Sequence, residues 1–152
     1  MLSKARRKLW TIRHLKKAGM GVDDVLKIFN VIVRSTLEYA VPTYHPMLNI
    51  DLRDRIESIQ KRACRIIFGW NCNYDKLVED GKVELLETRR EKMTLNFAKK
   101  CISNDRFKHW FKEKTRSEYN LRTEDKYEEL FARTERMKKS PLFYMRRALN
   151  AE

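Results

Sequence analysis

Apolar residues in the middle of the chain recur at the spacing of an amphipathic helix. They step by four, three, four and three residues, at Leu52, Ile56, Ile59, Ala63 and Ile66. Such steps place the side chains on one face of an α-helix. Asn49 or Asp51 can cap the start of this helix, and Gly69 follows its end. The pattern predicts a helix whose apolar face docks on a core while its basic residues point outward.

Three further stretches also favour helices. Near the N-terminus the apolar steps of three and four residues fall at Leu2, Ala5, Leu9, Ile12 and Leu15. Gly19 and Gly21 follow this stretch, and glycine commonly follows the last turn of a helix. From about Leu86 to Ile102, a second stripe consists of Leu86, Met93, Phe97 and Cys101. The residues from Asp23 to Ala40 are apolar on most sides, which predicts a central, buried helix capped by Asp23.

The end of this apolar stretch combines a lone base with prolines and aromatic rings. We interpret Arg34 as a snorkelling side chain or one paired with Glu38, four residues later. Pro42 and Pro46 cannot continue a helix interior, so VPTYHP predicts a rigid connector. A catalytic or metal site would need an acid or nucleophile at a suitable spacing, and none accompanies Tyr39, Tyr44 and His45. The segment is therefore expected to turn the chain.

The C-terminal third has a different character. An aromatic cluster, FKHWF, ends at Phe111, and the charge-mixed residues from Lys112 to about Asp125 predict a linker. One short amphipathic helix is expected around Tyr127, Leu130, Phe131 and Met137, and another after Pro141. These patterns predict a basic helical domain over residues 1–111, followed by a charged, partly flexible extension with short helices over residues 112–152.

The net charge of the chain indicates which classes of partner it can bind. The 34 Lys and Arg residues exceed the 21 Asp and Glu residues, which gives a net charge of +13 and favours polyanionic partners. No apolar run approaches the roughly 18 residues that cross a bilayer, so we expect a soluble, intracellular protein, nuclear or cytoplasmic, without a membrane partner. The three cysteines form no C-x-x-C pair, and no histidine stands at a zinc-like spacing from them. Reduced thiols, no bound metal and no cofactor are therefore expected.

The order of these pieces resembles the region that follows the palm in reverse transcriptases of non-LTR retrotransposons, the jockey-like and LINE-type elements. The resemblance runs from about Arg6 to Phe111. It rests on LRxLKxxG, matched by Ile12, Arg13, Leu15, Lys16 and Gly19, and on VRPxLEYAxPxWxP, matched by Val33, Arg34, Leu37, Glu38, Tyr39, Ala40, Pro42, Tyr44 and Pro46. Ser35 replaces a frequent proline of the family, and Tyr44 replaces a frequent tryptophan.

The resemblance implies an all-α, thumb-like helical bundle that grips a template–primer duplex, with a polymerase palm domain as a partner in a longer chain. It also implies that the aromatic residues of the connector are structural. The Y-x-D-D turn that holds the catalytic metal ions in this family is absent, since Lys76 follows Tyr74-Asp75. We therefore expect no polymerase activity and no catalytic residues.

The candidate functional residues are bases on the predicted helix faces. Such side chains can neutralise the phosphates of RNA, DNA or an RNA–DNA hybrid without reading sequence. The candidates are Arg13, Lys16, Lys17, Lys61, Arg62, Arg65 and Arg89. Of these, Lys61, Arg62 and Arg65 are expected to project near one another. The alternatives are a helical module for protein interaction or self-association, and a non-functional transposon remnant.

Overall fold

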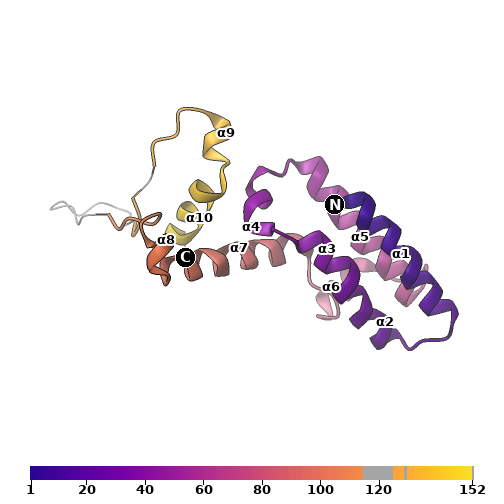
Figure 1. The fold of residues 1–152 in the computed structure, drawn as a ribbon. Coiled ribbons are helices and arrows are strands. Elements are labelled where there is room, and N and C mark those ends of the chain that lie inside the picture. The colour runs from indigo at the N-terminus through magenta and orange to yellow at the C-terminus, as the bar shows by residue number, and fades with distance from the viewer. Residues whose placement is uncertain (115–124, 129, 152) are drawn as a thin grey trace. The chain divides into compact units, whose positions relative to one another are not determined.

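A computed structural model describes residues 1–114, 125–128 and 130–151 of the chain. Helices make up most of this part, and its strand-like pairing is limited to an isolated antiparallel bridge between Glu113 and Tyr127. The predicted all-α class is confirmed. The chain forms two compact units (Figure 1). Unit 1 comprises Met1–Ala40 and Leu48–Arg89, and unit 2 comprises Val41–Met47 and Arg90–Glu152.

Three long helical segments build unit 1. They are α1 (Leu2–Lys17), the continuous run α2 (Val22–Phe29), η1 (Asn30–Arg34) and α3 (Ser35–Glu38), and α5 (Ile50–Phe68). These segments lie side by side in Figure 1, and α1 contacts both of the others. Each buries an apolar face, with Ile12, Phe29 and Ile59 almost wholly inaccessible to water. Unit 1 is thus held together by burial of the stripes predicted from the sequence.

The central segment differs from the prediction in its details. Its N-cap is Gly21 rather than Asp23, which instead lies in the first turn of α2. Its middle, η1, is a π-helical turn, a local widening that interrupts the α-helical ladder. There Arg34 donates to the side-chain oxygen of Asn30, with Nε at 3.0 Å, and Glu38 pairs elsewhere. Of the two interpretations of Arg34, the pair with Glu38 is not formed, because half-buried Arg34 bonds to Asn30 one turn earlier.

Helix α5 has the predicted ends. The Asn49 side chain accepts a hydrogen bond of 2.9 Å from the Leu52 backbone, and Gly69 follows with a φ of 105°, a conformation that favours glycine. The buried face is wider than the predicted stripe, because it also includes Gln60 and Cys64. Ile67 is buried, whereas the predicted Ile66 is half-buried. The added width covers α6 (Tyr74–Glu79) and Val83, which pack on Cys64.

Unit 2 combines two chain segments that are distant in the sequence. Its elements are α4 (Val41–Tyr44), η2 (His45–Met47), most of α7 (Leu86–Ile102), α8 (Asp105–Lys108), α9 (Glu135–Lys138) and α10 (Pro141–Asn150). The core consists of Ala98, Cys101, Phe111, Tyr127 and Met145. The division between units falls within α7 rather than at Phe111, because Phe111 packs with the C-terminal residues of this core. In α7 itself, Phe97 is exposed, contrary to the predicted stripe.

The connector VPTYHP is two short helical turns, α4 and η2, rather than an extended segment. Ala40 precedes them with a φ of 56°, and this left-handed residue redirects the chain. His45 is buried and lies 3.3 Å from the Tyr144 hydroxyl of α10, with the two rings edge to face. The segment packs as a structural element of unit 2.

The C-terminal extension is only partly the helix that was expected. Of the described residues 127, 128 and 130–137, only those from Glu135 onward are helical, in α9. Tyr127 instead joins the unit 2 core, where its backbone N–H donates to the Asn150 side chain at 2.9 Å. Residues 112–114 and 126–128 pair through two backbone hydrogen bonds of 3.0 Å. The rest of the predicted linker lies outside the described residues.

Candidate nucleic-acid interface

The C-terminal halves of α1 and α5, which carry most of the candidate bases, lie at the same end of unit 1. The two helices run side by side in the same direction (Figure 1), so their C-terminal halves are neighbours. The two helices contact each other, and Leu9 and Ile12 of α1 and Ile59 and Ala63 of α5 are all buried. Because both apolar faces turn inward, the basic residues of each helix remain on the outside.

The charged side chains of α1 are all basic. The helix contains seven bases and no acidic residue. Arg13 and Lys17 are exposed and Lys16 is half-buried, and none of them forms an ion pair with any residue that the structure describes. Lys8 differs, since its ammonium donates to the Ile32 carbonyl at 3.0 Å and to the Thr36 hydroxyl at 2.7 Å. Lys8 therefore ties α1 to the central segment.

Helix α5 separates its charges along its length. Its acidic residues lie in the first half, where Asp51 pairs with Arg55 at 3.1 Å. Arg62 and Arg65 lie in the second half, are exposed, and have no ion-pair partner within the described ranges. Unpaired guanidinium groups on a helix face are suited to bind phosphate oxygens. The acid-free end of α5 adjoins the acid-free α1.

Lys61 of α5 contacts an aromatic ring of α6. Its ammonium lies 5.3 Å from the ring centroid of Tyr74, at the start of α6. The Tyr74 hydroxyl accepts from Gln60 at 2.9 Å, which places this side of α5 against α6. Residues four apart on a helix lie on nearly the same face, so exposed Lys61 lies on the side of Arg65, whereas Arg62 is turned from Lys61 by about 100°. Lys61 thus stands beside Arg65, and its ammonium also contacts the Tyr74 ring.

Arg89 is engaged in an ion-pair network. It pairs with Glu38 of α3, and its Nη1 lies 3.5 Å from the Glu84 carboxylate. The hydrogen bond to Glu38 raises the pKa of the Arg89 guanidinium above its ordinary value, and both carboxylates add to this effect. The positive charge is already balanced by protein acids, so Arg89 fits a structural role better than a phosphate contact.

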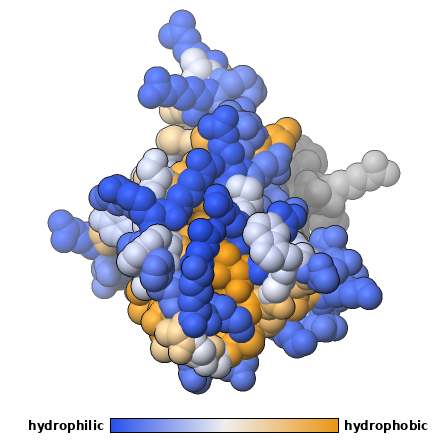
Figure 2. All heavy atoms as spheres, turned by 90° about the vertical axis from the view of Figure 1, so that its right-hand side faces the viewer, coloured by the Kyte–Doolittle hydropathy of each residue, from blue (hydrophilic) through white to orange (hydrophobic). Residues whose placement is uncertain are grey.

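An exposed aromatic pair on α1, which was not predicted from the sequence, lies beside the basic residues. Trp10 of α1 is 63% exposed, and its ring centroid lies 3.7 Å from that of His14. Both residues lie outside the apolar stripe of α1, and a tryptophan outside the stripe of an amphipathic helix was the available signal. Figure 2 shows the face on the right-hand side of Figure 1, where long hydrophilic side chains lie across smaller apolar patches. Exposed aromatic and basic groups thus occur on the same helix.

No family model, curated protein or solved structure matches the chain. Among the described residues, no three His, Cys, Asp or Glu side chains gather as a metal ion would require. In the same part of the chain, no helix combines the length and apolarity needed to span a bilayer.

Proposed function

We propose that unit 1 binds nucleic acid through the sugar–phosphate backbone, using the adjoining basic ends of α1 and α5. The observation that carries the proposal is the set of exposed bases without described ion-pair partners, Arg13, Lys17, Arg62 and Arg65, with Lys16 beside them. A solvated helix face usually interleaves acids and bases, and these two helix ends do not.

Two packed helices suit a phosphate backbone. Helices in contact lie about 8–10 Å apart, so bases on both can reach successive or facing phosphates of one duplex. Each phosphate that a base neutralises releases condensed counterions, which makes affinity fall as salt rises. The contacts carry no sequence information, so we expect similar affinity for RNA, DNA and RNA–DNA duplexes of different sequence.

The resemblance to the thumb of retrotransposon reverse transcriptases agrees with this proposal. In that reading the chain grips a template–primer duplex and leaves polymerisation to a palm domain in a longer chain. The sequence lacks the Y-x-D-D turn that would hold catalytic metal ions. We therefore expect the protein to bind duplex without extending a primer.

A charge-matched pair of variants tests the proposal. The test variant changes four unpaired bases to glutamine: Arg13, Lys17, Arg62 and Arg65. The control variant removes the same net charge from bases on other faces of unit 1: Lys27, Arg55, Lys76 and Lys82. Three of the control residues pair with acids in the structure. Binding of a labelled duplex is measured by fluorescence anisotropy over a series of salt concentrations.

The salt dependence distinguishes binding at the proposed surface from attraction of the duplex by net charge alone. The test variant is expected to bind more weakly and to flatten the slope of log affinity against log salt by about 0.9 per lost phosphate contact. The control variant is expected to keep nearly the parental slope. Equal losses in both variants would mean that net charge alone attracts the duplex, and the proposed surface would be wrong.

A second candidate, protein interaction or self-association, is favoured by exposed apolar side chains on unit 1. Tyr39, Ile50 and Trp70 are 81%, 77% and 81% exposed. Large apolar side chains left in water are typical of surfaces that bind another protein. Light scattering over a range of protein concentrations distinguishes the candidates, because self-association raises the apparent mass without nucleic acid.

A further inference from the structure

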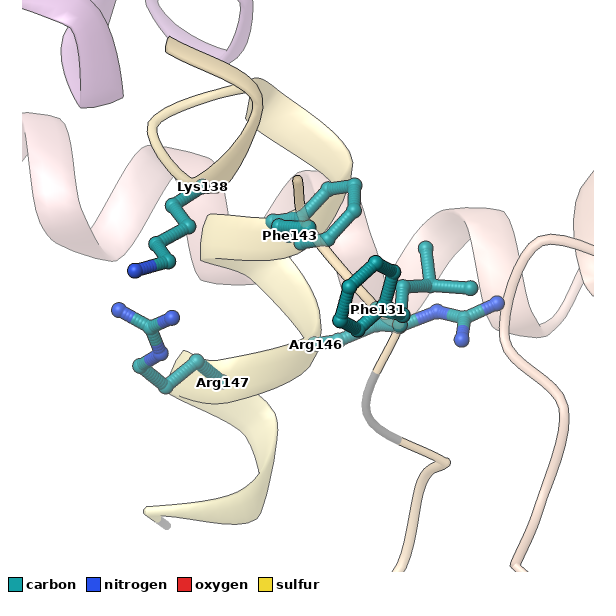
Figure 3. Close-up of a pocket in the computed structure, with 7 residues that line it drawn as sticks. Phe131, Lys138, Phe143, Arg146 and Arg147 are labelled. Carbon is teal, nitrogen blue, oxygen red and sulfur yellow. The ribbon is translucent and has the colours of Figure 1, made fainter. Parts of the chain in front are cut away.

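A hollow in unit 2 has one aromatic side and one cationic side. It has a volume of about 530 Å³ and is lined by Leu130, Phe131, Ala132, Lys138, Phe143, Arg146 and Arg147. Figure 3 shows the rings of Phe131 and Phe143 on one side of α10 and the charged ends of Lys138 and Arg147 on the other. An aromatic surface and a pair of cations therefore border the same space.

The aromatic side is accessible. Phe131 is 87% exposed, although a phenylalanine loses favourable burial energy in such a position. Phe143 is half-buried and comes from α10, so one ring is exposed at the surface and the other is held on a helix. A flat ligand can stack on such rings and remove their faces from water.

The cationic side already attracts an anion. The Lys138 ammonium lies 2.6 Å from the Glu135 carboxylate, and the pair is exposed. The hydrogen bond from Lys138 lowers the pKa of Glu135 below its ordinary range, and the charges of Lys138, Lys139 and Arg147 lower it further. Exposed ion pairs are weak, so an anionic group of a polyanion can compete with Glu135 for Lys138. Residues 130–151 contain six bases and one acid, so the surroundings favour such an anion.

Arg146 lines the hollow but does not direct its charge into it. Its guanidinium donates to the Glu128 carbonyl at 2.7 Å and to the Trp110 carbonyl through Nε at 2.8 Å. These bonds turn its charge away from the hollow, as Figure 3 shows, and leave only its stem in the lining. Arg146 ties the carbonyls of Glu128 and Trp110 to α10. The backbone at these two residues is therefore held to the helix that lines the hollow.

We propose that this hollow binds an unpaired nucleotide of single-stranded RNA or DNA. The base stacks on Phe131 and Phe143, and a neighbouring phosphate pairs with Lys138 and Arg147. The volume lies within the roughly 300–1,000 Å³ of small-molecule sites, which accommodates one nucleotide. Single-strand binding proteins combine the same two elements, aromatic rings for the bases and positive charge for the backbone. The site goes beyond duplex binding by unit 1 and does not depend on it.

The experiment separates stacking from charge. Fluorescence anisotropy compares a labelled oligothymidine strand with an abasic strand that has the same number of phosphates. Phe131→Ala removes the exposed ring, Phe131→Tyr retains a stacking ring, and Phe97→Ala is a matched control because Phe97 is an exposed phenylalanine on α7. All are made in the full chain carrying glutamine at Arg13, Lys17, Arg62 and Arg65, so that duplex binding by unit 1 contributes little.

The parent in this background is expected to prefer the thymidine strand. Phe131→Ala should weaken thymidine binding by about 5- to 150-fold, leave abasic binding unchanged, and leave the thermal melt unchanged, since the ring lies outside the core. Phe131→Tyr and Phe97→Ala should bind as the parent does. Equal affinity of the parent for both strands, or equal loss of both strands in Phe131→Ala, would overturn the proposal. The proposal would also be overturned if Phe131→Ala lost binding to phosphatidylserine vesicles but bound the thymidine strand as the parent does. The hollow would then be a membrane-binding surface instead.

Discussion

Glu38 and Arg89 form an ion pair across 51 positions of sequence, linking the end of α3 to the first turn of α7. Only 10% of the Glu38 side chain is exposed, so its carboxylate depends on this partner more than a surface acid would. Glu84 adds a second acid to the same guanidinium. The pair ties the first turn of α7 to α3 within unit 1.

Arg89→Gln is expected to destabilise unit 1 by about 1.5–3 kcal/mol, because Glu38 loses a charged hydrogen-bond donor in a largely buried position. Urea unfolding followed by circular dichroism measures the change. The salt slope of duplex binding should stay at the parental value when the variant is folded. A stable variant with a reduced salt slope would instead make Arg89 a phosphate contact.

Lys61→Gln and Arg62→Gln should differ although the two residues are adjacent. Arg62 faces outward without a described ion-pair partner, whereas Lys61 lies over the Tyr74 ring beside α6. Loss of Arg62 is expected to reduce the salt slope of duplex binding by about 0.9, and loss of Lys61 by clearly less. Anisotropy titrations at several salt concentrations measure both slopes. A larger effect from Lys61 would move the interface toward α6.

Cys72 should react with iodoacetamide at pH 8 before Cys64 does. Burial is the largest cause that raises the pKa of the Cys64 thiol to about 12, so almost no thiolate forms there at pH 8. Cys72 is only half-buried. Peptide mass spectrometry over time gives the order of modification, and urea should make both thiols react. Faster modification of Cys64 in the folded protein would show that α6 does not cover it.

The same thiol predicts a loss of stability at alkaline pH. Its pKa is raised from 9.0 in the unfolded chain to about 12 in the folded protein. Its contribution is therefore complete below pH 9 and is lost as the pH rises from 9 toward 12, because the unfolded chain releases the proton first. Relative to Cys64→Ala, the parent should lose unfolding free energy over this range. Parallel pH profiles for the two proteins would contradict the assignment.

Arg146→Met should destabilise unit 2 by about 1–3 kcal/mol. Methionine keeps an apolar stem of similar length but leaves the Trp110 and Glu128 carbonyls without their donor. Arg147→Met is the matched control, because Arg147 is the exposed neighbour on α10, and its stability should change by less than about 0.5 kcal/mol. Tryptophan fluorescence during urea unfolding measures both. Equal stability of the two variants would show that the Arg146 bonds contribute little.

The sequence by itself determined the helices whose apolar residues recur at a fixed period. Helix α7 has the predicted ends, Leu86 and Ile102, and α5 has the predicted cap at Asn49. These features follow from interactions within a few residues, which a pattern can display. The basic character of α1 was equally visible, because charge is a property of composition.

Tertiary structure alone decided which of these bases have partners. Nothing near Arg89 in the sequence indicates Glu38, and nothing near Lys61 indicates the Tyr74 ring, because both contacts arise when separate helices pack. The same holds for Tyr127, whose place in the unit 2 core depends on Phe111 and Met145 rather than on a helical period. Local periodicity specifies which face of a helix is buried, but the element that covers that face is chosen by the shape and volume of the whole core.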